Sequence, residues 1–290
     1  MKQSIILTVA PPGAGKTTWA EKVASKKGFV NLNRDDLRKF HYPEQYKNHS
    51  LNKTQENKVT NEQKRLATEA LKAGKTIIVS DTNINPETRQ VWKDIASGYG
   101  VKYFEKHFRI ENYLQTCLER NALRKVGRVP DHVIRKFYAD YRAQYMKPYD
   151  PAVEVPGAYL FDIDGTLALN TSGRSPYDWD RVGEDVPNVD VVRVCRRLGK
   201  VTKIVVMSGR DACCYNITKE WLLTHGIPFD SLIMRPAGNT EPDWIVKYDL
   251  FKKHVEPNYE VFGIYDDRNQ VVDMWRKIGL TCFQVAEGNF

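Results

Sequence analysis

The stretch Ala10-Pro11-Pro12-Gly13-Ala14-Gly15-Lys16-Thr17 decides the fold of the first half of this 290-residue chain. An apolar run over residues 5–9 precedes it, and residues 19–27 after it have the pattern of a helix. A strand, a glycine-rich loop and a helix in this order typically bind phosphate, because glycines let backbone N–H groups converge on phosphate oxygens. We therefore predict a P-loop that binds ATP, with an ordinary strand-to-helix turn as the alternative.

The side chains of this loop have separate predicted roles toward ATP and its metal ion. Lys16 is expected to reach the β- and γ-phosphates, and the Thr17 hydroxyl to hold Mg²⁺. The usual motif begins with glycine, and Ala10 in its place would be strained if its φ were positive. The predicted nucleotide-binding residues of the loop are Gly13, Gly15, Lys16, Thr17 and Thr18.

Length and charge limit the class of protein. The chain is long enough for two domains with separate cores. Lys and Arg number 44 and Asp and Glu 36, so the formal charge of +8 suits a polyanionic partner, although a merely basic soluble protein has the same balance. We find no signal-peptide pattern and no apolar run of membrane-spanning length. The five cysteines lack metal-ligand spacing, so we predict reduced thiols, a cytoplasmic location and no membrane partner.

A charged cluster follows the second predicted strand, residues 28–32. Ligands of open α/β sheets bind at the carboxyl ends of strands. Asp35 is therefore predicted to take the proton of an attacking hydroxyl, and Arg38, one helical turn later, to clamp an acceptor phosphate. The alternative is that Asp35 or Asp36 only caps the next helix.

Two later strand ends complete the predicted site of the first half. Residues 76–80 form a buried strand that ends at Asp81, which could orient an arginine or a metal-bound water, or cap a helix instead. After a strand over residues 101–108, a helix from about residue 112 carries Arg120 and Arg124 on one face. Such a segment serves as a lid over the phosphates in P-loop phosphotransferases, and an exposed basic helix end is the alternative.

A proline-rich segment divides the chain. Residues 147–157 contain three prolines and one glycine and show no periodicity, which is typical of a domain boundary. We predict a first domain over residues 1–146, a linker over residues 147–157 and a second domain over residues 158–290.

The second half opens with an apolar strand that runs into Asp162-Ile163-Asp164-Gly165-Thr166. Two carboxylates at this spacing can divide the work around one Mg²⁺: Asp162 would attack phosphorus, and Asp164 would protonate the leaving oxygen and later activate water. A surface turn is the alternative. The motif resembles that of the haloacid-dehalogenase superfamily, which implies the same roles and makes both carboxylates candidate metal ligands.

The superfamily resemblance implies further pieces, and the chain has them in order. A strand over residues 203–208 ends in Ser208, which could hold the transferring phosphoryl group, with Arg210 beside it. Lys247 corresponds to the phosphate-stabilising lysine.

A third strand, residues 261–265, ends in Asp266 and Asp267, which would complete the Mg²⁺ shell. Asp267 is our first choice as the direct ligand, although the sequence does not separate the two. Arg174 lies in the insertion after the nucleophile and would contact substrate, unless it is an ordinary loop arginine.

Over essentially its whole length, the chain resembles the bacteriophage polynucleotide 5′-kinase/3′-phosphatase family. The resemblance rests on the motifs above and on residues 173–178 and 270–276. It implies two α/β domains, a P-loop parallel sheet with flanking helices followed by a haloacid-dehalogenase-like Rossmannoid domain. The lid departs from the family pattern, because in Arg124-Lys125-Val126-Gly127-Arg128 the glycine is shifted relative to the arginine. In the kinase site, the resemblance implies that Asp35 is the general base, that Arg38 binds the acceptor phosphate and that Arg124 is the lid arginine. It also implies that Asp81 supports this site and that Arg120 lies near the adenine. In the phosphatase site, it implies that Asp162 and Asp164 are joined by Arg174, Arg210 and Asp243.

The same resemblance implies a function. The chain would phosphorylate 5′-hydroxyl ends of RNA and DNA with ATP and Mg²⁺ and would remove 3′-phosphates, with 2′,3′-cyclic phosphates as further candidates. It implies partnership with a nucleic-acid ligase, a homotetramer, and a host cytoplasm if a phage encodes the chain. The rival hypotheses are a bifunctional small-metabolite kinase/phosphatase and a non-catalytic nucleic-acid-binding module with degenerate sites.

Overall fold

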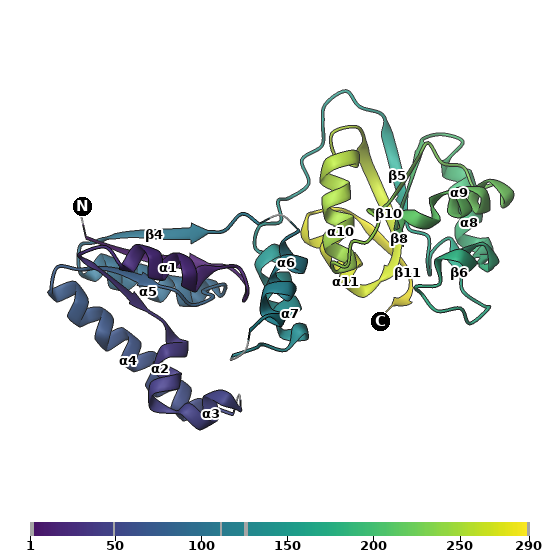
Figure 1. Ribbon diagram of the computed structural model, residues 1–290. Coiled ribbons are helices and arrows are strands. Elements are labelled where there is room, and N and C mark those ends of the chain that lie inside the picture. The colour runs from purple at the N-terminus through teal and green to yellow at the C-terminus, as the bar shows by residue number, and fades with distance from the viewer. Residues whose placement is uncertain (1–2, 49, 111, 125–126, 289–290) are drawn as a thin grey trace. The chain divides into compact units, whose positions relative to one another are not determined.

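The computed structural model describes residues 3–48, 50–110, 112–124 and 127–288. The chain divides into two compact units, Met1–Tyr145 and Met146–Phe290, which Figure 1 shows in purple to teal and in teal to yellow. Each unit has one main sheet with helices packed against it, so the predicted class of two α/β domains is confirmed. Among the described residues, no helix combines the length and the apolar character needed to cross a bilayer.

The first unit contains a four-stranded parallel sheet in the order β2-β3-β1-β4. Its inner strands β1 and β3 are apolar and buried, as expected for a parallel sheet covered on both faces. The strands are β1 (Ser4–Val9), β2 (Phe29–Leu32), β3 (Thr76–Val79) and β4 (Lys102–His107), and the helices are α1 (Lys16–Ala24), α2 (Arg34–His41), α3 (Pro43–Lys47), α4 (Lys53–Lys72), α5 (Pro86–Gly98), α6 (Tyr113–Ala122) and α7 (Asp131–Ala143).

Helix α3 was not predicted. Residues 41–50 show no periodicity, yet α2 extends to His41 and α3 follows at once. Pro43 begins α3, where its missing N–H and fixed φ are compatible with a helix start. A helix of five residues is too short to display a 3.6-residue repeat, so its pattern could not be detected.

The second unit contains a five-stranded parallel sheet in the order β11-β10-β5-β8-β9 and a small antiparallel pair, β6 with β7. The strands are β5 (Gly157–Phe161), β6 (Ala168–Leu169), β7 (Val186–Pro187), β8 (Lys203–Asp211), β9 (Ser231–Arg235), β10 (Glu260–Arg268) and β11 (Cys282–Gly288), and the longer helices are α8 (Val189–Leu198), α9 (Tyr215–Thr224), α10 (Asp243–Leu250) and α11 (Asn269–Lys277). Short helical turns lie at Trp179–Glu184, Ala212–Cys214 and Phe251–Val255.

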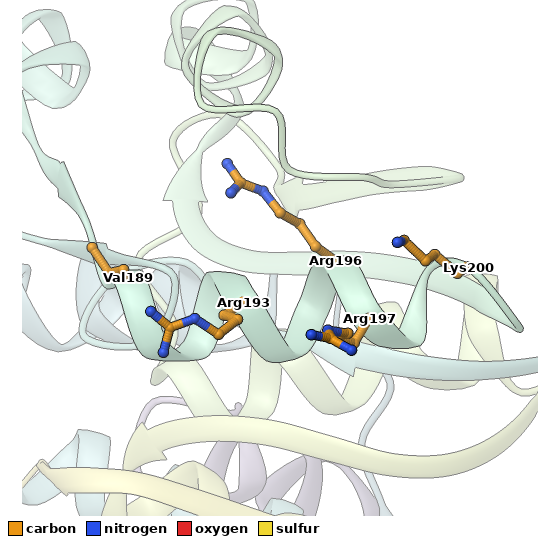
Figure 2. Close-up of a pocket in the computed structure, with 5 residues that line it drawn as sticks. All are labelled: Val189, Arg193, Arg196, Arg197 and Lys200. Atoms are coloured by element: carbon orange, nitrogen blue, oxygen red, sulfur yellow. The ribbon is translucent and has the colours of Figure 1, made fainter.

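Helices cover both faces of this sheet. Trp275 of α11 and Val246 of α10 pack on the face that includes Leu160, whereas α8 and α9 pack on the opposite face around Phe161 and Val206. Helix α8 buries an apolar stripe and directs its basic side chains outward (Figure 2).

The predicted linker, residues 147–157, packs on the second unit. The Lys147 N–H donates to the Tyr248 hydroxyl at 2.8 Å, and the Tyr149 N–H donates to the Ile278 carbonyl at 2.7 Å. The Tyr149 hydroxyl in turn accepts from the Val261 N–H at 2.8 Å. The proline-rich segment is therefore an ordered strap that leads into β5.

Candidate active sites

The P-loop connects β1 to α1 through two glycines with left-handed backbone angles, Gly13 at φ +85° and Gly15 at φ +87°. Gly15 is the residue before α1, so the first N–H groups of that helix are directed toward the loop. A Cβ on Gly13 would lie 2.5 Å from the carbonyl oxygen of Cys117 in α6. Ala10 is not among the described residues with positive φ, so the strain considered for it does not arise.

Gly13→Ala is expected to destabilise the first unit, because the methyl group would meet backbone atoms of α6 at an unfavourable φ. We expect a loss of about 3 kcal/mol in the free energy of unfolding of this unit in urea. The control is Gly28→Ala, where φ is +91° but no atom lies within 4 Å of the added Cβ, and we expect about 1 kcal/mol there. Equal losses in the two variants would contradict the contact between the loop and α6.

Lys16 is almost completely buried, with 8% of its surface exposed. Its Nζ donates to the Pro11 carbonyl oxygen at 2.7 Å. Burial lowers the pKa of Lys16 to about 8, and the charge of Arg124 acts in the same direction. Thr17 and Thr18 are exposed in the first turn of α1 and are accessible to a ligand. A buried ammonium group beside free helix N–H groups suits a polyphosphate, whose charge would stabilise it.

Asn33, not Asp35 or Asp36, caps helix α2. Its side-chain oxygen accepts the Asp35 N–H at 2.8 Å, so the capping alternative for the two aspartates is excluded. The Asp35 side chain is 54% exposed, and its Oδ1 lies 2.6 Å from Arg38 Nη1. Asp35 and Arg38 therefore lie together at the carboxyl end of β2, on the side of the sheet where the P-loop follows β1.

Glu56 of α4 holds Arg38 in place, and the sequence did not point to it. The Arg38 Nε and Nη2 groups donate to the two Glu56 oxygens at 2.9 Å each, and Arg34 Nη2 donates to the same carboxylate at 2.5 Å. A carboxylate on an amphipathic helix is ordinarily part of a solvated face, so only the fold distinguishes this one.

Asp81 connects the end of β3 to the start of α2. Its Oδ1 accepts the Arg34 N–H at 2.9 Å and its Oδ2 accepts from Gln63 Nε2 at 2.7 Å. Burial raises the pKa of Asp81. The side chain thus satisfies the N-terminus of α2 from a neighbouring strand and sets the position of the helix that carries Asp35.

The predicted lid arginines lie at the end of α6. A Cβ on Gly15 would be 3.8 Å from Arg120 Nη1, so Arg120 lies beside the P-loop. Arg124 is exposed, with Nη1 3.4 Å from the Gly127 carbonyl oxygen. Buried Asn121 closes this loop, because its side chain bonds both the N–H and the carbonyl of Val129, at 3.0 and 2.7 Å. Lys125 and Val126 lie outside the described residues.

The second site is built around Lys247, which is buried among carboxylates in α10. Its Nζ lies 2.8 Å from Asp162 Oδ1, 2.9 Å from Asp266 Oδ2 and 3.7 Å from Asp243 Oδ2. Burial disfavours the ammonium charge, but the carboxylates outweigh it and raise the pKa of Lys247 well above its usual value. Burial also raises the pKa of Asp162, the predicted nucleophile.

Three carboxylates form a candidate metal site. Asp162, Asp266 and Asp267 each offer one oxygen, and these oxygens lie within 4.8 Å of one another. A Cβ on Gly165 would lie 2.1 Å from Asp267 Oδ2, so glycine is needed for this approach. Burial and the neighbouring Asp266 raise the pKa of Asp267 to about 6. Crowded carboxylates with raised pKa values fit a hard divalent cation such as Mg²⁺.

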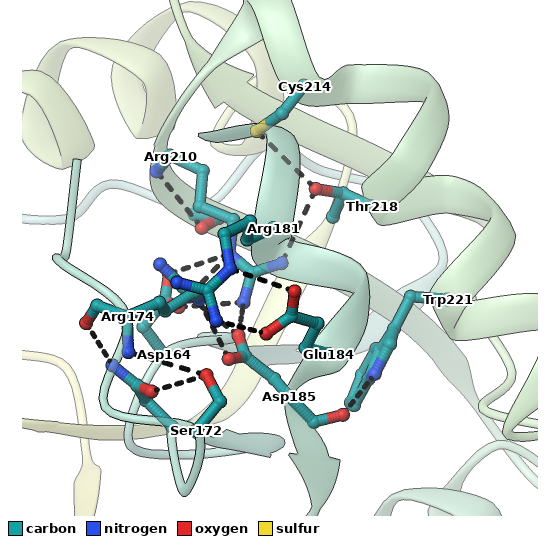
Figure 3. A network of polar contacts seen from close by, with 12 residues as sticks. Asp164, Ser172, Arg174, Arg181, Glu184, Asp185, Arg210, Cys214, Thr218 and Trp221 are labelled. Carbon is teal, nitrogen blue, oxygen red and sulfur yellow. Dashed lines mark hydrogen bonds and ion pairs between the residues drawn. The ribbon is translucent and has the colours of Figure 1, made fainter. Parts of the chain in front are cut away.

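Asp164 is not part of this trio, although we predicted it as a metal ligand. Its carboxylate turns toward two arginines: Arg210 Nη2 lies at 2.7 Å and Arg174 Nη2 at 3.2 Å (Figure 3). Arg174 is 5% exposed, which excludes an ordinary loop arginine.

Asp185 pairs with both of these arginines, and the sequence did not predict it. Its Oδ2 accepts from Arg174 Nη2 and from Arg210 Nη2, both at 2.6 Å (Figure 3). The Asp185 side chain is 1% exposed. The separation of 11 and 25 residues from its partners leaves no local pattern that could reveal it.

The remaining predicted residues, Ser208 and Asp243, lie beside Arg210 and Lys247. Ser208 is fully buried, and its hydroxyl accepts the Arg210 N–H at 3.2 Å. Asp243 Oδ1 accepts from Arg235 Nη2 at 3.0 Å, and Gly209 leaves the space that this carboxylate occupies.

A family model described as the polynucleotide kinase PNKP phosphatase domain matches residues 156–290. The match covers most of the second unit. A model described as an AAA domain matches residues 5–148. The chain therefore matches an AAA-type domain in its first half and a polynucleotide kinase phosphatase domain in its second half, which agrees with both predicted superfamilies.

Two curated relatives are similar to this chain. A protein of Autographa californica nuclear polyhedrosis virus, provisionally named a bifunctional polynucleotide kinase/RNA ligase, is 32% identical over 98% of this chain. A Schizosaccharomyces pombe protein named bifunctional polynucleotide phosphatase/kinase is 22% identical over 57% of the chain. The chain spans 42% and 36% of the lengths of these relatives. A solved chain of the Pnkp1/Rnl/Hen1 RNA repair complex is 26% identical, covering all of this chain and 97% of its own, with a TM-score of 0.48.

Asp185→Asn is expected to destabilise the second unit, because Arg174 and Arg210 would lose a shared buried counter-charge. We expect about 3 kcal/mol lower free energy of unfolding of this unit in urea. The control is Glu184→Gln, which removes an exposed ion pair with Arg181, and we expect almost no change there. If Asp185→Asn were as stable as the control, the two arginines would not depend on this carboxylate.

Proposed function

We propose that this chain is a bifunctional nucleic-acid end-healing enzyme. It transfers the γ-phosphate of ATP to 5′-hydroxyl ends of RNA or DNA and removes phosphate from 3′ ends, including 2′,3′-cyclic phosphates. The observation that carries the proposal is the union of a P-loop domain with a domain of the polynucleotide kinase phosphatase family on one chain. Because the matched region covers less than half of each curated relative, the activities in their names support the proposal but are not assigned to this chain by the match itself.

In the kinase half, the loop around Gly13 and Gly15 would hold the ATP phosphates, with Lys16 at the phosphates and Thr17 at Mg²⁺. Bound Mg²⁺ would offset the charge of the phosphate oxygens. Asp35 is exposed enough to meet an incoming 5′-hydroxyl and accept its proton as phosphorus is attacked. Arg38 uses three of its N–H groups on Glu56 and Asp35, so two remain for an acceptor phosphate.

In the predicted lid, we propose that Arg124 stabilises the charge on the transferring phosphoryl group. Arg120 lies beside Gly15 and would contact the nucleotide near its adenine. Asp81 supports the site indirectly, through the Arg34 N–H at the start of α2.

In the phosphatase half, an Asp162 oxygen attacks phosphorus, and the bond from phosphorus to the 3′-oxygen breaks. Asp164 donates a proton to that leaving oxygen and then takes one from the water that releases inorganic phosphate from Asp162. Lys247 neutralises charge beside the nucleophile. A substrate phosphate would compete with Asp164 for Arg174 and Arg210, so that the released carboxylate takes up a proton from solvent before it acts as the acid.

Among the carboxylates, Asp267 is the better candidate for the direct Mg²⁺ ligand beside Asp162. Lys247 and the Trp275 indole N–H, at 2.9 and 3.3 Å, both engage the Asp266 carboxylate. Bound Mg²⁺ would stabilise the charge that develops on the phosphate oxygens.

The kinase claim is tested with ATP labelled in its γ-phosphate and a 5′-hydroxyl oligonucleotide in Mg²⁺. Label transfer supports the proposal, and its absence refutes it. Transfer to a free nucleoside or sugar but not to the oligonucleotide would favour the small-metabolite rival. Binding of nucleic acid without turnover of either end would favour the non-catalytic rival.

We further propose that a nucleic-acid ligase consumes the products, since 5′-phosphate and 3′-hydroxyl ends are what ligation joins. The name of the baculovirus relative pairs a polynucleotide kinase with an RNA ligase, which supports this partnership. The homotetramer and the cytoplasmic location remain predictions. Light scattering on a sizing column would test the first.

A further inference from the structure

Four basic side chains on α8 and just after it form a stripe on the outer face: Arg193, Arg196 and Arg197 of the helix, and Lys200, which follows its end at Leu198. They are exposed, whereas Val191, Val192 and Cys195 of the same helix are buried in the core. Together with Val189 the stripe lines a shallow hollow of about 340 Å³ (Figure 2). The mechanism proposed above uses none of these residues.

Little of this positive charge is neutralised by the protein. Arg193 pairs with Asp190 at 2.9 Å, but both side chains are largely exposed. Arg196 Nε donates to the Gly226 carbonyl at 3.0 Å, and its Nη2 donates to the His225 carbonyl, which are neutral acceptors. Within the part of the chain that the structure describes, no carboxylate lies within ion-pair distance of Arg197 or Lys200.

Helix α8, which carries most of the stripe, begins close to the loop that follows the Asp162–Thr166 turn. Asn188, just before α8, donates its N–H at 2.9 Å to the Leu167 carbonyl, which follows the Asp162–Thr166 turn. Helix α8 then runs back along the sheet toward the start of β8. Arg193 and Arg197 are about 6 Å apart along the axis of α8, about the axial length of two phosphate steps of one nucleic-acid strand, and Lys200 follows the end of the helix.

We propose that this stripe binds the phosphate backbone of the strand whose 3′-phosphate occupies the catalytic site. The proposal rests on the proposed phosphatase function and names how that site would select a polynucleotide over a small phosphate ester. Phosphates along the strand would replace the missing counter-charges of Arg197 and Lys200, and Arg193 would exchange an exposed aspartate for a phosphate.

Basic residues near a helix C-terminus also stabilise the helix dipole, so the test separates binding from stability. The test variant is Arg197→Gln/Lys200→Gln. The matched control is Lys253→Gln/Lys277→Gln, which removes the same charge from exposed positions in the helical layer on the opposite face of the sheet. The substrates are a nucleoside 3′-phosphate and a long single-stranded oligonucleotide with a 3′-phosphate.

We expect the test variant to lower the ratio of kcat/KM for the long substrate over the short one about tenfold at low salt, and the control to keep the ratio of the unmodified chain. The salt dependence of oligonucleotide affinity should become shallower by about 1.4 in log–log slope, from two lost contacts. The charge-preserving Arg197→Lys/Lys200→Arg variant should retain the ratio.

An unchanged ratio and slope in the test variant would overturn the proposal, whether or not its melting temperature falls. An acidic protein as the occupant would give that same result. Absence of activity on either substrate in the unmodified chain would instead refute the proposed function. The two failures are therefore distinguishable.

Discussion

Asp162→Asn is expected to abolish 3′-phosphatase activity, by about a thousandfold or more, and to leave 5′-kinase activity intact. The asparagine keeps the shape of the side chain but loses the oxygen nucleophile. It also removes one carboxylate from around Lys247, whose Nζ lies 2.8 Å from Asp162 Oδ1. The measurement is release of inorganic phosphate from a 3′-phosphorylated oligonucleotide, with label transfer from ATP assayed on the same preparation.

Asp273→Asn is the control for this variant. Asp273 is an exposed aspartate on α11 that has no part in the proposed phosphatase chemistry or in the basic stripe, and both activities should persist when it is changed. Full phosphatase activity in Asp162→Asn would refute the nucleophile assignment. Loss of kinase activity along with phosphatase activity would show that the two sites do not work independently.

Lys16→Ala is expected to have the opposite selectivity. Removing the buried ammonium group from the P-loop should reduce 5′-kinase activity by about 10²- to 10³-fold, because the charge meets the phosphates where negative charge develops. Phosphatase activity should be unaffected, since Asp162 and its partners belong to the other unit. The measurement is the rate of label transfer from ATP to a 5′-hydroxyl oligonucleotide at saturating ATP.

The matched control is Lys22→Ala, an exposed lysine on the same helix. It should keep both activities. Equal kinase rates in the Lys16 and Lys22 variants would mean that the glycine loop does not bind the donor nucleotide.

The parts of the two sites that short sequence motifs encode could be predicted from the sequence. The P-loop and the Asp162–Thr166 turn were predicted because glycine, lysine and carboxylate lie close together along the chain, directly after an apolar strand. The carboxyl ends of parallel strands lie at one edge of the sheet, so the proximity of Asp35 and Asp81 could be predicted without knowing how the helices pack on the sheet. The fold class followed from the same alternation of strands and helices.

What the sequence did not predict depends on contacts between distant segments. Glu56 and Asp185 each hold two arginines, from helix and loop positions that show no local signature. Asp164 lies outside the carboxylate trio for the same reason, because its carboxylate pairs with the buried Arg174 and Arg210, and its role as a metal ligand stays a prediction. Pairings of this kind depend on which loops fold over the sheet, which periodicity does not reveal.

The central claim is that one chain heals both ends of a strand, and one reaction tests it most directly. A single RNA with a 5′-hydroxyl and a 3′-phosphate is incubated with Mg²⁺ and ATP whose γ-phosphate contains ¹⁸O, and the product is examined by mass spectrometry with sequencing from each end. We predict a strand with an ¹⁸O-labelled 5′-phosphate and a free 3′-hydroxyl. A product that retains its 3′-phosphate, or that lacks the label at its 5′ end, would contradict the account.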